Sequence, residues 1–217
     1  MRVFKLVTAL LAVTAFSAVA VATASATETL WLWNPGTTGA TFTGASGKAT
    51  LQVKGGASIT CATSESKEGK LTSERTLGTV TIVFKTCTTV GLAVLGLGDV
   101  ANTITTHVAI HDCLISSGDA GLLIKLTEPV HIEVPSTGLL LVVTGTLVVL
   151  ISPNKSKKTG PFPLNVAQTA GVQAIEKCEG GTAQKLETST DGGANVQSGE
   201  EAKEGSITWA AAEEIVV

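Results

Sequence analysis

Four cysteines, Cys61, Cys87, Cys113 and Cys178, are the residues whose chemistry follows most directly from their spacing. A structural zinc site needs close pairs such as C-x-x-C, and these cysteines are too far apart in the chain to provide one. An even number of cysteines in an oxidising compartment predicts two disulfides, for which 3 pairings exist. We expect Cys61–Cys87 and Cys113–Cys178, because sequential pairing closes one short and one longer loop without entangling the two halves of the chain.

The three histidines could bind a metal only if the fold brought them together. His107 and His111 share one face of a predicted strand, but about 13 Å would separate them, too far for one ion. His131 and Glu133 share a strand face at about 7 Å, and with His111 or Asp112 they could form the mixed-ligand site of a metal-dependent hydrolase. Their alternation with apolar residues favours a solvated strand face instead, so we assign no metal, no cofactor and no catalytic residue.

Trp31 and Trp33 are the candidate ligand-binding residues. At alternate positions of a strand, both rings would project to one side, where they could stack on a sugar if exposed or anchor the strand if buried. Because the chain has no tyrosine, we favour burial. The chain also lacks the G-x-S-x-G motif of nucleophilic hydrolases and the Lys-containing glycine loop of nucleotide-binding proteins, which favours a non-enzymatic protein.

The first 26 residues predict export. Arg2 and Lys5 precede an uncharged apolar run, and the small residues Ala24, Ser25 and Ala26 form a signal peptidase site. We therefore expect residues 1–26 to be a signal peptide and residues 27–217 to form one secreted or cell-surface domain, with no later stretch long enough to span a membrane as a helix. Removing the signal leaves 13 of the 15 basic residues against 18 acidic ones, a balance that argues against nucleic acid as a partner.

Apolar residues of the remaining chain recur at period two, which predicts strands. We expect an all-β fold, either an antiparallel β-sandwich or an open barrel with Gly/Ser-rich turns, and at most one short helix, within residues 166–177. The run Leu139–Ile151 predicts a strand buried on both faces or bent at Gly145. Glu200, Glu201 and Glu204 stand in a Gly-flanked polar stretch that predicts a solvated loop. The predicted strands are residues 48–53, 58–63, 78–86, 104–112, 122–126, 130–134, 139–151, 184–189 and 206–210.

Residues 61–71 and 113–123 share the pattern C-x2-S-x4-G-x-L, and residues 80–84 form an apolar strand leading into Cys87. With the signal peptide and the Gly/Thr-rich strands, these features resemble uncharacterised secreted proteins of high-GC Gram-positive, actinobacterial type, over roughly residues 47–209. The resemblance implies an exported β-rich fold and brings no activity.

Three functions are compatible with these patterns. The first is a non-enzymatic secreted or cell-surface protein with a structural or interaction role, whose partner is another surface protein or a cell-wall component. The second is a binding module for wall polysaccharide or an apolar ligand, using Trp31, Trp33 or the lining around Leu139–Ile151; an apolar cavity would support it and a fully packed core would not. The third is the metal-dependent hydrolase.

Overall fold

The computed structural model describes residues 32–33, 38–67, 69–73, 76–115, 119–152, 159–190 and 193–216. This part of the chain consists of strands and turns, so the all-β prediction is confirmed, and the residues for which at most one short helix was allowed contain a small hairpin, at residues 168–173. The predicted signal peptide lies outside the described residues. Within them, no helix has the length and apolarity that crossing a bilayer requires. The strands are β1 (Leu32–Trp33), β2 (Thr41–Ser46), β3 (Ala49–Val53), β4 (Ser58–Cys61), β5 (Thr63–Ser66), β6 (Gly69–Lys70), β7 (Thr76–Lys85), β8 (Thr88–Thr89), β9 (Leu92–Ala93), β10 (Leu95–Gly96), β11 (Thr103–Ile115), β12 (Asp119–Leu126), β13 (Val130–Val134), β14 (Leu139–Ile151), β15 (Phe162–Val166), β16 (Gln168–Thr169), β17 (Val172–Gln173), β18 (Leu186–Thr190), β19 (Val196–Trp209) and β20 (Ile215–Val216).

Antiparallel pairing closes the main sheet into a ring. Its order is β14–β12–β11–β7–β5–β2–β19–β15, and β15 pairs in turn with β14. Of the two predicted arrangements the pairing therefore favours the barrel, which β15 closes. Closed sheets of roughly eight strands have an interior that either fills with side chains or holds one small ligand.

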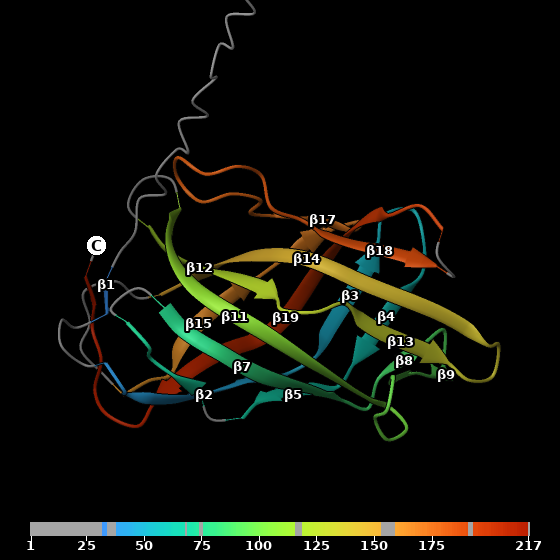
Figure 1. Cartoon of the computed structure of the whole chain (residues 1–217), viewed down its shortest axis with the longest axis horizontal. Coiled ribbons are helices and arrows are strands. Elements are labelled where there is room, and N and C mark those ends of the chain that lie inside the picture. Colours follow the sequence, from blue (N-terminus) through green and yellow to red (C-terminus); the bar gives the residue numbers. More distant parts are fainter. Residues whose placement is uncertain are drawn as a thin grey trace, which may run out of the picture.

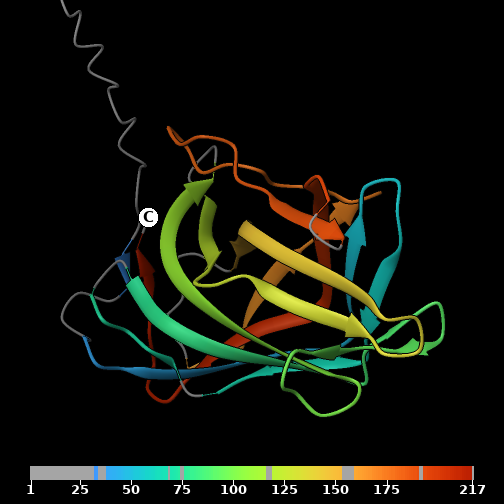
Figure 2. The same ribbon diagram turned by 45° about the vertical axis from the view of Figure 1, so that its right-hand side comes forward.

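Long strands run the length of the wall, and short strands share the positions between them. β7, β11, β14 and β19 cross the molecule in Figures 1 and 2. β15 and β18 occupy the same position between β14 and β19, one after the other. In the same way, β2 and β3 follow each other along the opposite edge of β19. On the edge shared by β15 and β18 the change of partner leaves residues 199–201 of β19 outside the ladder, whereas on the β2–β3 edge Lys203 bonds to Gly47 and Lys48 across the change.

β14 is the predicted strand Leu139–Ile151; it bends, and only its second half is buried on both faces. Val143 and Leu147 face the interior of the ring, whereas Val148 packs outside it against the segment that carries Cys178. Gly145 has φ 110°, and a side chain there would collide with the backbone at Lys185, which explains why glycine stands at the bend.

Both predicted disulfides are present, and they indicate an oxidising environment. Cys61–Cys87 joins the end of β4 to the chain just after β7, and Cys61 faces the interior of the ring. Cys113–Cys178 fastens the segment between β17 and β18 over the outer face of β11 and β14, where it forms a small apolar cluster with Ile115 and Val148.

A cavity inside the closed sheet

The interior of the ring is not fully packed. It holds a cavity of about 170 Å³, bordered by every strand of the ring and by β3, β4, β13 and β18. Several inward side chains keep accessible surface because they face this space. The lining is mostly aliphatic and aromatic, and it includes Phe42, Leu51, Ile59, Val80, Ile82, Phe84, Ile104, Val108, Leu122, Ile124, Leu126, Val143, Leu147, Leu164 and Val166.

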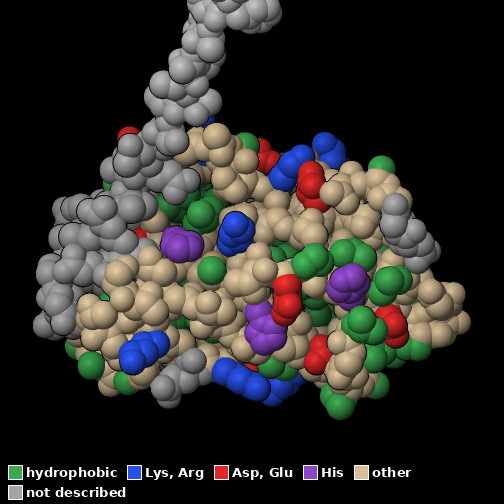
Figure 3. All heavy atoms as spheres, viewed as in Figure 1, with side chains coloured by type: hydrophobic (Ala, Val, Ile, Leu, Met, Phe, Trp, Pro, Cys, Tyr) green, Lys and Arg blue, Asp and Glu red, His purple; other side chains and the backbone are tan. Residues whose placement is uncertain are grey.

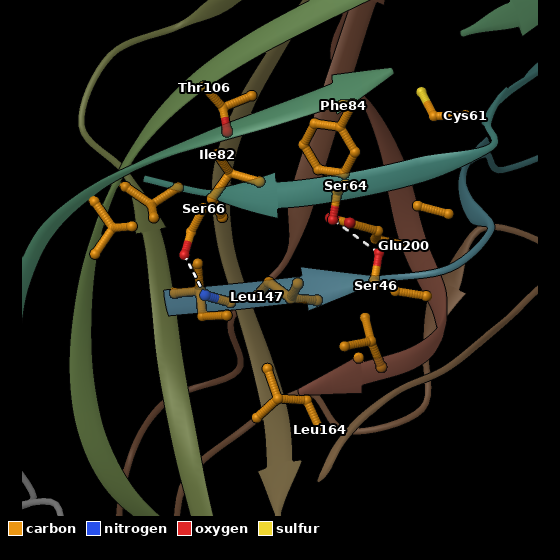
Figure 4. A pocket seen from close by; sticks show the side chains of 18 of the residues that line it. Ser46, Cys61, Ser64, Ser66, Ile82, Phe84, Thr106, Leu147, Leu164 and Glu200 are labelled. Carbon is orange, nitrogen blue, oxygen red and sulfur yellow. Dashed lines mark hydrogen bonds between the residues drawn. The ribbon is translucent and has the colours of Figure 1, made fainter. Parts of the chain in front are cut away.

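One wall of the cavity is polar. The Ser46 and Ser64 hydroxyls, on β2 and β5, lie 2.7 Å apart, and the Ser46 hydroxyl also donates to the Gly47 carbonyl at 3.1 Å. Ser66, two residues further along β5, accepts a hydrogen bond from the Gly44 amide at 2.5 Å. Figure 4 shows these serines projecting toward the cavity, with the Glu200 side chain on the same side as the Ser46–Ser64 pair. The cavity therefore has an apolar body and one polar patch.

Glu200 points inward because β19 contains a bulge. Glu200 and Ala202 both line the cavity, as the period of two requires, and so do Gly205 and Ile207 further along. The inward-facing positions are even-numbered before Glu204 and odd-numbered after it. Glu204 has φ 55°, and the register with β15 shifts at the same place. The solvated loop predicted around Glu200 is therefore wrong: the segment is the middle of a long strand, and one carboxyl lies inside.

β3 lies along one edge of β19 at Glu200, and on the opposite edge a side chain takes the place of a strand. β18 pairs with β19 up to Ser198 and β15 pairs from Ala202, so Glu200 falls in the gap between them. The buried Gln173 amide fills this gap: it accepts from the Glu200 N–H at 2.9 Å and donates to the Glu200 carbonyl at 3.1 Å. The β16–β17 hairpin that carries Gln173 lies so close to Gly199 that a Cβ there would meet Gln168 at 2.8 Å.

Burial raises the pKa of Glu200 from 4.5 to about 7. The physical cause is desolvation: the carboxylate loses water in this mostly apolar cavity, and no hydrogen bond or positive charge from the described residues replaces it. Among the described residues that line the cavity, Glu200 carries the sole ionisable side chain, since Cys61 is in a disulfide. The cavity thus holds one carboxyl without a counter-charge.

No protein-family model, curated protein or solved structure matches this chain.

The predicted candidates fall elsewhere or outside the described part. Trp31 is not among the described residues, and only the backbone of Trp33 is described, paired with Ile215. Their role in ligand binding stays a prediction. Leu139–Ile151, the other predicted lining, does contribute Val143 and Leu147 to the cavity.

The histidines do not assemble as the hydrolase hypothesis requires. His131 borders a polar pocket together with His107 and Glu128, whereas His111 lies away from it and contacts Thr76. The His107 Nε2 and Glu128 Oε1 atoms are 3.9 Å apart. On the face shown in Figure 3 the histidines lie apart from one another. The described residues contain no group of three or more side chains that could hold a metal ion, so His111, His131 and Glu133 do not come together there as the predicted site requires.

Proposed function

We propose that this protein binds a small apolar molecule inside its closed sheet, without catalysis. The observation that carries the proposal is the cavity of about 170 Å³, lined chiefly by aliphatic and aromatic side chains. An apolar cavity of about 150 Å³ in another protein stays dry and takes up benzene, so this volume suits a ligand of one ring or a short branched chain. Preformed apolar cavities with a few polar groups are the usual form of small-molecule sites.

The setting proposed for this activity is extracellular. Two disulfides support an oxidising compartment, and the predicted signal peptide supports secretion, free or attached to the cell wall. A non-enzymatic role is supported by the lining itself, where one carboxyl stands without a histidine, a free thiol or a second acid among the described residues. A binding protein that protects or transports an apolar compound outside the cell fits these features best.

Ligand binding is testable with toluene as the probe. We expect saturating toluene to raise the free energy of unfolding by about 2.7 kcal/mol at 100 times its Kd, because the ligand binds the folded state alone. In methyl NMR spectra the signals of Leu147, which lines the cavity, should shift on titration, whereas those of Val90, which is 90% exposed, should not.

A matched pair of variants localises the site. Ala202→Leu places a larger side chain in the cavity and should abolish toluene binding. Lys203→Leu introduces leucine at the next position, which is exposed, and should leave binding intact. Toluene that neither stabilises the wild-type protein nor shifts the Leu147 methyl signals would reject the proposed function. Equal binding by both variants would place the ligand elsewhere.

A second candidate function, interaction with another surface, is favoured by exposed apolar side chains in neighbouring loops. Val90 is 90% exposed, Leu97 65% and Val100 74%. The loops that carry them are joined by hydrogen bonds around Cys87, whose amide donates to the Asn102 carbonyl. Serine at all three positions should shift the protein from the cell-envelope fraction to the medium if these loops attach it, and an unchanged distribution would reject this role.

A further inference from the structure

We propose that the cavity selects an apolar ligand that carries one protonated amine, with Glu200 as its partner. This inference rests on the proposed function and specifies the ligand class for the same site. It follows from the placement of a single acidic side chain in an otherwise neutral enclosure. The natural ligand would be a small hydrophobic amine whose apolar body lies against β11, β12 and β14 and whose nitrogen reaches the polar wall.

The Glu200 carboxyl carries an electrostatic cost in the folded protein. Folding already removes water from the Glu200 carboxyl, and the neighbouring elements return no positive charge. β2, β3, β15, β16 and β17 contain no ionisable side chain. Leu186 of β18 lines the cavity, whereas the next residue, Glu187, does not. Glu187 forms an ion pair with Lys185 at 2.7 Å. A ligand cation would supply the missing charge, at the cost of its own desolvation and of the freedom that it loses on binding.

The hydroxyl groups add a geometric reason. An ammonium group has three donors and no acceptor, so it needs several acceptor oxygens around it. The wall beside Glu200 offers the Ser46 and Ser64 oxygens in addition to the carboxylate. A ligand carboxylate would instead meet the ionised Glu200 and be repelled. An alcohol would donate a hydrogen bond to the carboxylate but would bring no positive charge to neutralise it.

The proposal predicts how binding depends on pH. Below pH 7 Glu200 is increasingly protonated and no longer attracts a cation, so affinity for an amine should fall. Affinity should rise as the pH increases through about 7 and remain high until the amine itself loses its proton, near pH ~10 for an alkylamine. A neutral ligand of the same shape should not show this rise.

The test uses toluene, benzyl alcohol, benzylamine and benzoate, which share one ring and differ in the polar group. At pH 8.5, calorimetric titration of the full secreted chain should show benzylamine binding at least about tenfold more tightly than benzyl alcohol, because the ammonium group adds the positive charge that the ionised carboxylate lacks. In Glu200→Gln this preference should disappear, and in Glu201→Gln, which changes the neighbouring residue outside the cavity lining, it should remain. Circular dichroism establishes that both variants fold.

The outcomes separate the two proposals. If toluene binds but benzylamine has no advantage over benzyl alcohol at pH 8.5, the amine inference is wrong and the proposed function stands. If the preference survives in Glu200→Gln, another group recognises the nitrogen and the inference is equally wrong. If none of the four compounds binds, the proposed function fails first.

Discussion

The sharpest prediction for the protein without ligand concerns Glu200→Gln and pH. The pKa of Glu200 is about 7 in the folded protein against 4.5 for an ordinary glutamate, and at 1.36 kcal/mol per unit this difference corresponds to a cost of about 3 kcal/mol. Between pH 4.5 and 7 the unfolded chain releases the proton while the folded protein keeps it. The contribution of Glu200 to stability therefore falls as the pH rises through this range and is constant above it.

Glutamine resembles the protonated carboxyl and does not ionise. We expect Glu200→Gln to match the wild-type protein in stability near pH 4 and to exceed it by up to about 3 kcal/mol at pH 8. Guanidinium unfolding with intact disulfides, followed by circular dichroism at both pH values, measures the difference. Glu201→Gln is the control, expected within about 0.5 kcal/mol of wild type, as is usual for substitutions outside buried features. A variant no more stable than wild type at pH 8 would refute the desolvation argument.

Three further predictions concern the wall of the ring. Gln173→Leu leaves the Glu200 amide and carbonyl unpaired in a buried gap and should lower the unfolding free energy by about 3 kcal/mol in urea titrations; a loss below about 1 kcal/mol would show that β19 does not depend on this amide. Val90 has φ 49° and precedes a glycine in the β8–β9 turn, so Val90→Asn should stabilise by about 1 kcal/mol, and any destabilisation in the same titrations would contradict the strain argument. Serine at Cys113 and Cys178 opens a loop with a separation of 65 residues and should cost about 4 kcal/mol; an unchanged guanidinium midpoint would argue that the outer segment is held without the disulfide.

Local patterns in the sequence were sufficient to predict the fold class and the covalent bonds. Alternation is a property of a single strand, so β13 and β14 could be located to the residue before any partner was known. The disulfide pairing also followed from chain order, because cysteines that are successive along the chain were joined. The apolar Leu139–Ile151 even predicted a covered outer face, which the segment carrying Cys178 provides.

Tertiary structure alone decided that the sheet closes and that the cavity contains a carboxyl. Closure depends on the pairing of β15 with both β14 and β19. The alternation of apolar and polar residues within one strand does not show which distant strand it pairs with. The orientation of Glu200 depends on a one-residue bulge at Glu204, which shifts every later side chain on β19 to the opposite face. A polar sequence between glycines is typical of a loop, and its burial requires the amide of Gln173, far along the chain, to complete the strand. The physical reason is common to these cases: strand formation is favoured residue by residue, whereas the interior of a closed sheet exists only when all of its strands are paired.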